Sequence, residues 1–131
     1  MKLEIKQVIQ AVDLGEYAEV YRGKILRVWV NPPRAVWREY ESVLDENQRR
    51  VAELQSDERR IEEHAKWAAE TFVPLVHGWY AKLWSQGANP AEHWTADEIA
   101  ELSEADPALY DWMQRRSLRE LTDFRRAEKK S

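Results

Sequence analysis

The chain has 131 residues, of which 44% are hydrophobic and 34% are charged, and its formal net charge is −4. This length favours one domain with a real core over two independent domains. The absence of cysteine excludes a disulfide framework and a thiolate zinc site, and the acidic balance disfavours general affinity for nucleic acid.

The N-terminal stretch MKLEIKQVIQ lacks the apolar region of a signal peptide. No stretch of the sequence approaches the roughly 18 uninterrupted apolar residues that a membrane span requires. We therefore expect a cytoplasmic protein without a membrane segment. Charge is unevenly placed, because residues 91–111 carry seven acids and no Lys or Arg, whereas residues 114–131 carry seven basic residues against three acids. Mutually attracting solvated helix faces explain this pattern, and a dedicated partner surface is the alternative.

Residues 1–31 have the composition of β-strands. The runs at 17–22 and 24–30 meet at Gly23, which can adopt a positive φ, and this predicts a β-hairpin between them. The second run is almost entirely apolar, so we expect it to lie between other strands and a layer of helices. An edge strand that pairs with another chain is the alternative.

The consecutive residues Asn31, Pro32, Pro33 and Arg34 end the strand region, since two prolines cannot continue a ladder, and a helix is predicted to follow. Over the next forty residues, a set of mostly apolar positions is spaced alternately three and four residues apart, as in a heptad repeat. Its positions are Trp37, Tyr40, Leu44, Asn47, Val51, Leu54, Glu58, Ile61, Ala65, Ala68, Phe72 and Leu75. This pattern fits one long helix or an antiparallel helical hairpin in which the stretch Ser56, Asp57 and Glu58 caps the second helix, and compactness favours the hairpin.

The stretch 67–84 has the densest set of large apolar side chains and is predicted to be the central helix of the core. Six side chains fall close to helical spacing and define its expected buried face: Trp67, Phe72, Leu75, Val76, Trp79 and Leu83. Pro74 lies within the pattern and removes one backbone donor, so we expect a kink or a new helix start at this position.

Two helix starts are predicted near the C-terminus. Thr95 and Glu98 form a capping-box pattern, and Asp106 followed by Pro107 is typical of an N-cap and first helical residue. The inner face of the last helix is expected to carry Leu109, Trp112, Met113, Leu118, Leu121 and Phe124, and its basic end carries Arg125, Arg126, Lys129 and Lys130. The basic end complements the helix dipole.

The sequence therefore predicts an α+β fold, mainly a helical bundle with an N-terminal antiparallel β-hairpin or three-stranded sheet. Residues 1–131 form a single domain in this interpretation. It comprises a β region at 1–31, helices at 33–84 that include the central apolar helix at 67–84, and C-terminal helices at 95–128.

No motif for catalysis, metal binding or cofactor binding is evident. The three histidines, His64, His77 and His93, lack the spacing of helical metal motifs, and the four glycines are isolated rather than grouped in a phosphate loop. The carboxylates lie in charged helical runs, where solvated faces explain them. We expect a protein that is not an enzyme and has no metal or cofactor.

Several short sequence motifs, in this order, resemble those of the tail assembly chaperones of long, flexible-tailed phages. They are the sequences DLGEY at 13–17, WVNPPR at 29–34 followed by WRE at 37–39, LVHGW at 75–79 and LYDWM at 109–113. The resemblance implies a non-catalytic protein of the host cytoplasm that binds the tape-measure protein and helps to recruit tail-tube subunits. Self-association is a further partner prediction, and nucleic acid is disfavoured.

A chaperone for a helical client should offer apolar positions flanked by charge. The heptad-like positions of the 34–66 region, which we call the seam, are sparsely apolar and have charged neighbours, so they have this character. The predicted partner-binding residues are Trp37, Tyr40, Leu44, Val51, Leu54 and Ile61. Intramolecular packing of the same residues is the alternative. Two other functions stay open: a structural phage or prophage connector or completion protein retained in the virion, and a small DNA-associated regulator that uses Arg115, Arg116 and Arg119.

Overall fold

The computed structural model describes residues 3–87 and 89–130, with side chains as far as residue 127. The predicted mainly helical α+β fold is confirmed. Within the described residues, its main elements are β1 (Ile9–Asp13), β2 (Ile25–Trp29), α1 (Arg34–Ala52), α2 (Glu58–Trp67), α3 (Val73–Leu83), α4 (Ala96–Ala105) and α5 (Pro107–Lys130). Shorter turns are the 3-10 helices η1 (Leu14–Glu16), η2 (Glu19–Tyr21) and η4 (Pro90–Glu92) and the π-helical turn η3 (Ala68–Phe72).

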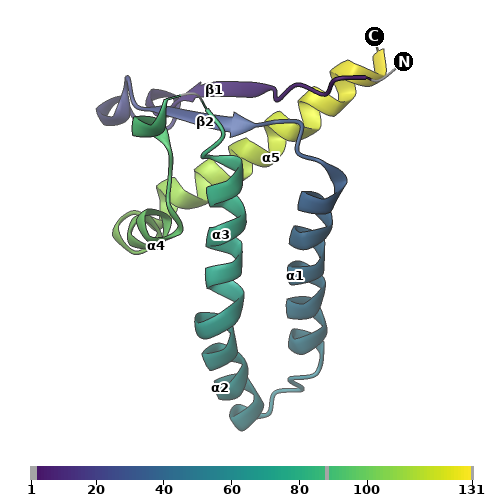
Figure 1. Ribbon diagram of the computed structural model, residues 1–131. Coiled ribbons are helices and arrows are strands. Elements are labelled where there is room, and N and C mark those ends of the chain that lie inside the picture. Colours follow the sequence, from purple (N-terminus) through teal and green to yellow (C-terminus); the bar gives the residue numbers. More distant parts are fainter. Residues whose placement is uncertain (1–2, 88, 131) are drawn as a thin grey trace.

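Figure 1 shows a two-stranded sheet with α5 running beneath it, while α1 and the α2–α3 segment project away from the sheet as an antiparallel pair. We call α1, α2, η3 and α3 together the helical arm. The hydrophobic core lies where the base of the arm meets the sheet, α4 and α5. Its buried apolar residues are Val12, Leu14, Leu26, Val28, Val30, Trp79, Tyr80, Leu83, Trp84, Ile99, Leu109, Met113 and Leu121.

The sheet pairs β1 with β2 in antiparallel orientation, with Val12 opposite Leu26. β2 lies where the sequence predicts it, but the predicted hairpin across Gly23 is wrong, because residues 17–22 form 3-10 turns rather than a strand. Their aromatic side chains explain the difference: Tyr17 packs on Trp112 of α5 with ring centroids 5.7 Å apart, and the Tyr21 hydroxyl donates to Asp106. These contacts fold the segment onto α5 instead of into the sheet.

The alternative of a helical hairpin for residues 34–66 is confirmed. α1 ends at Ala52, and Gln55 and Ser56 take positive φ values of 48° and 62° in the turn. Asp57 then caps α2 by accepting hydrogen bonds from the backbone amides of Arg59 and Arg60. The turn chemistry thus interrupts a pattern that continues in the sequence.

At Pro74, where a kink or a new helix start is predicted, the backbone stays helical, and the irregularity is a π-helical turn that ends at Phe72, directly before α3. Proline lacks an N–H and its ring crowds the preceding turn, and a wider turn relieves both conditions. The predicted inward face of α3 is buried only in part. Trp79 and Leu83 are buried as predicted, but the predicted burial of Leu75 is wrong, since this side chain is 47% exposed.

The C-terminal helices begin as predicted. The capping box of Thr95 and Glu98 is complete, and Asp106 accepts a hydrogen bond from the backbone amide of Leu109 at 3.1 Å. Of the expected inner face of α5, Leu109, Met113 and Leu121 are buried, whereas the other three residues pack at its border. The predicted basic side chains of Lys129 and Lys130 lie outside the described side chains.

Candidate functional site

A cavity of about 250 Å³ lies where the helical arm meets α5. Two residues come from α1, four from the end of η3 and the first turns of α3, and two from the first half of α5. We call this cavity the arm pocket, and its lining residues are Tyr40, Leu44, Phe72, Val73, Val76, His77, Tyr110 and Gln114. Most of these side chains are apolar or aromatic, so the pocket suits an apolar ligand surface.

A stack of aromatic rings supports the pocket from beneath. The ring of Tyr40 stacks on Trp79 with centroids 4.1 Å apart, and Trp37 lies 5.8 Å from the same indole. The hydroxyls of Tyr40 and Tyr80 lie 3.3 Å apart, at hydrogen-bonding distance. Because Trp79 and Tyr80 are almost fully buried, these contacts hold the α1 wall of the pocket at a fixed position against α3.

His77 forms the polar part of the pocket wall. Its imidazole is buried and meets the ring of Tyr110 edge-on, with centroids 5.5 Å apart. Burial lowers the pKa of His77, because the charged form loses its hydration, and the neutral ring is therefore favoured. Burial also raises the pKa of the Tyr110 phenol, whose oxygen accepts a hydrogen bond from the Gln114 amide. The pocket wall is consequently uncharged near neutral pH.

The six predicted partner-binding residues separate into three groups. Trp37, Tyr40 and Leu44 lie at the base of the arm, where the last two line the arm pocket and Trp37 packs on Trp79. Leu54 borders a separate, polar hollow beside the turn that joins α1 to α2. Val51 and Ile61 are 49% and 45% exposed. The predicted set therefore does not form one apolar site, because only its first three residues lie at the arm pocket or its aromatic support.

Sequence reasoning did not assign the α3 and α5 walls to a site. Phe72 and Val76 were expected in the buried face of the central helix, and Tyr110 appears in the resemblance without a role. Tyr110 and Gln114 are four residues apart and therefore share a helix face next to the predicted inner face of α5. That spacing was a usable signal, but the meeting of this face with α1 depends on the tertiary fold.

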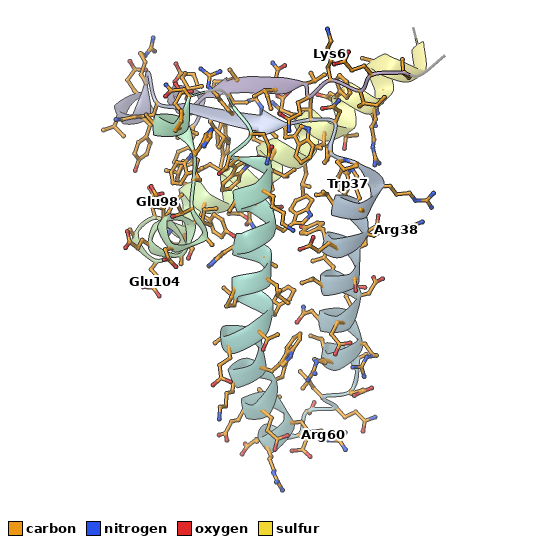
Figure 2. All side chains as sticks on the ribbon, viewed as in Figure 1. Lys6, Trp37, Arg38, Arg60, Glu98 and Glu104 are labelled. Carbon is orange, nitrogen blue, oxygen red and sulfur yellow. The ribbon has the colours of Figure 1, made fainter. Side chains whose placement is uncertain are left out.

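The far end of the arm is dominated by charge. Arg49 and Arg50 both bond Glu46, and Arg59 bonds Glu63. The guanidinium of Arg50 also lies 4.1 Å from the ring centroid of Trp67, which covers one face of this tryptophan. Figure 2 shows Arg60 at the end of the arm away from the sheet. These groups keep an otherwise thinly packed helical pair well solvated.

Two of the three arginines proposed for DNA binding have carboxylate partners. Arg115 pairs with Asp111 at 2.8 Å, and Arg116 pairs with Glu120 at 2.8 Å and with Glu16 at 3.2 Å. The side chain of Arg116 is only 17% exposed. A phosphate would have to compete with these carboxylates for the same donors.

Over residues 3–87 and 89–130, no helix combines the length and the apolar character needed to cross a membrane. In the same part of the chain, His, Asp and Glu side chains form no group of three or more placed to hold a metal ion.

Comparison with known proteins gives no match to any family model, curated protein or solved structure. The resemblance to tail assembly chaperones therefore stays a prediction, and the site is interpreted from its own geometry.

Proposed function

We propose that this chain is a non-catalytic tail assembly chaperone of a long, flexible-tailed phage, which binds the tape-measure protein and helps to recruit tail-tube subunits. The observation that carries the proposal is the arm pocket, an apolar cavity built from three helices at the base of a projecting helical hairpin. Its partner would be an amphipathic helix of the client, because such a helix presents apolar side chains at the spacing of one or two turns.

The surroundings of the pocket support a helical client. Val73 and Leu75 extend the apolar surface from the pocket onto the outside of α3, where they are 40% and 47% exposed. Gln114 supplies a polar side chain at the opposite wall. An apolar centre with a polar border is the usual composition of a surface that binds a partner reversibly.

Two of the sequence motifs that carry the resemblance contribute residues to the arm pocket. The stretch 75–79 contains Val76 and His77 of the pocket, and the stretch 109–113 contains Tyr110. The motif at 29–34 leads directly into α1, which supplies the third wall of the arm pocket. Two of the resembling stretches thus supply residues of the arm pocket, whereas the stretch 13–17 lies in the end of β1 and in η1.

Co-expression tests the proposal. The tape-measure protein from the genome that encodes this chain is produced alone, with the wild-type chain, and with the Val73→Glu variant. We expect the wild-type chain to keep the tape-measure protein in the soluble fraction and to co-purify with it, and the variant to do neither. A client that is equally soluble without the chain would contradict the proposal.

Mass spectrometry of purified virions separates the chaperone from the connector. A chaperone leaves before the particle is complete, so we expect the chain in infected cells but not in mature particles. An abundant signal in mature particles would favour a connector or completion protein. For the DNA-associated alternative, the carboxylate partners of Arg115 and Arg116 predict no salt-dependent binding to duplex DNA.

A further inference from the structure

The segment before β1 is held in an extended conformation by one side chain. The Asn31 amide oxygen accepts a hydrogen bond from the Val8 backbone N–H at 2.7 Å, and its amide nitrogen donates to the Lys6 carbonyl at 2.7 Å. Val30 N–H also donates to the Val8 carbonyl, at 3.0 Å. Asn31 therefore takes the place of a strand neighbour and extends the hydrogen-bond ladder beyond the end of β2.

The direction of these bonds leaves one edge of the strand free. In an antiparallel pair, alternate residues bond to the partner strand, and here the bonds of Val8 and Leu14 place the even-numbered residues of β1 on the β2 side. The N–H and C=O groups of Ile9 and Ala11 must then point to the opposite edge. Among the described residues they have no backbone partner beyond the sheet, and Figure 1 shows β1 at the outer border of the molecule.

The same segment exposes two large apolar side chains. Leu3 and Ile5 are 79% and 74% exposed, and they alternate with the charged residues Glu4 and Lys6. Lys6 lies at the border of the molecule away from the helical arm (Figure 2). An open strand edge next to exposed apolar side chains is a template for pairing with another strand.

We propose that residues 3–7 form a dimerisation strand that pairs in antiparallel orientation with the same residues of a second copy of the chain. The order of charges specifies this partner. When Ile5 lies opposite Ile5 of the second copy, Glu4 lies opposite Lys6 in both halves of the interface, so the segment complements itself. If the alternation of β1 continues into this segment, residues 3, 5 and 7 present their backbone groups to the outer edge and exchange the hydrogen bonds in this register.

The paired segment is short, so the dimer forms at high protein concentration and dissociates on dilution. Pairing of the two segments would bring the Ile5 side chains of the two copies side by side on one face of the sheet and place the two helical arms in one particle. Two arm pockets in one assembly would bind two separate segments of a long helical client with higher avidity than one pocket. The dimer proposal depends on the open edge of the strand and does not require the proposed client.

Sedimentation equilibrium of the full chain over a wide concentration range tests the dimer. We expect Ile5→Lys and Glu4→Lys each to raise the dimer dissociation constant by about tenfold or more. The double variant with Glu4→Lys and Lys6→Glu should return the dissociation constant to the wild-type value. The matched control is Val20→Lys, because Val20 is 82% exposed in η2 and lies outside the strand. A monomer at every concentration, or a dimer unchanged by Ile5→Lys, would overturn the proposal.

Cross-linking tests the register directly. The chain has no cysteine, so Ile5→Cys introduces a single thiol. Residues opposite each other in a hydrogen-bonded pair have Cα atoms about 5.5 Å apart, which a disulfide spans. We expect Ile5→Cys to form a covalent dimer under mild oxidation much faster than Val20→Cys. Equal rates for the two variants would reject the register, and circular dichroism verifies that both are folded.

Discussion

The indole Nε1 of Trp79 donates a hydrogen bond of 2.7 Å to the main-chain carbonyl of Val36 and thereby joins the middle of α3 to the first turn of α1. Trp79 is 1% exposed, and the rings of Trp37 and Tyr40 pack on it. This one side chain therefore sets the distance between the two helices at the base of the arm, where the arm pocket is located.

Replacing Trp79 should destabilise the fold strongly. We expect Trp79→Ala to lower the free energy of unfolding by about 3–5 kcal/mol, the usual cost of removing a buried aromatic side chain. Trp67→Ala should cost less, about 1 kcal/mol, because Trp67 is half-buried and its contact with Arg50 lies at the thinly packed end of the arm. Urea unfolding measures both values. Equal losses would mean that the core extends along the whole arm.

Ser117 carries the hydrogen bond of a second buried indole. Its hydroxyl accepts a bond of 2.8 Å from Trp84 Nε1 and donates to the Met113 carbonyl at 2.7 Å. Ser117→Ala leaves the indole N–H buried without this acceptor, so we expect a loss of about 1–3 kcal/mol. Thr122→Ala is the control, since Thr122 makes the same bond to the carbonyl four residues earlier in α5 but is exposed. A loss for Thr122→Ala as large as that for Ser117→Ala would contradict this account.

His77 should make stability depend on pH. Its pKa is lowered by burial, so below about pH 6.5 the unfolded chain binds a proton that the folded chain does not. Stability from this source is complete above the unfolded pKa and is lost as the pH falls toward the folded pKa. We expect the stability difference between about pH 7.5 and about pH 5.5 to shrink in His77→Gln, which cannot titrate. An unchanged difference in denaturant unfolding would show that His77 is not responsible.

The sequence predicts local structure well where a few neighbouring residues determine it. The capping box at Thr95, the N-cap at Asp106 and the irregular helical turn before Pro74 all follow from short-range chemistry. The turn at Asp57 was one of two alternatives, because a heptad-like pattern continues across it and periodicity alone does not distinguish one helix from two.

The wrong predictions from the sequence concern features that tertiary contacts determine. The aromatic residues at 17–22 look like a strand, but Trp112 of α5 and Asp106, which directly precedes α5, hold Tyr17 and Tyr21 in turns. Leu75 fits the apolar face of the central helix and lies one turn before the buried Trp79, but it is 47% exposed, because burial depends on which neighbouring elements cover that turn. For the same reason the predicted partner-binding set contains only two of the residues that line the arm pocket, Tyr40 and Leu44. The α1 residues of the pocket follow from the seam, and its α5 wall depends on how distant helices meet.

Binding of client helices to the purified chain tests the central claim most directly. Labelled overlapping peptides that cover the helical part of the tape-measure protein are titrated with the full chain, and fluorescence anisotropy reports binding. The variants are two valines replaced by glutamate: Val73, which lines the arm pocket, and Val20, which is exposed elsewhere. We predict that a subset of peptides binds the wild-type chain, that Val73→Glu weakens binding about tenfold or more, and that Val20→Glu does not change it. Binding of no peptide, or equal binding by the wild-type chain and Val73→Glu, would contradict the account.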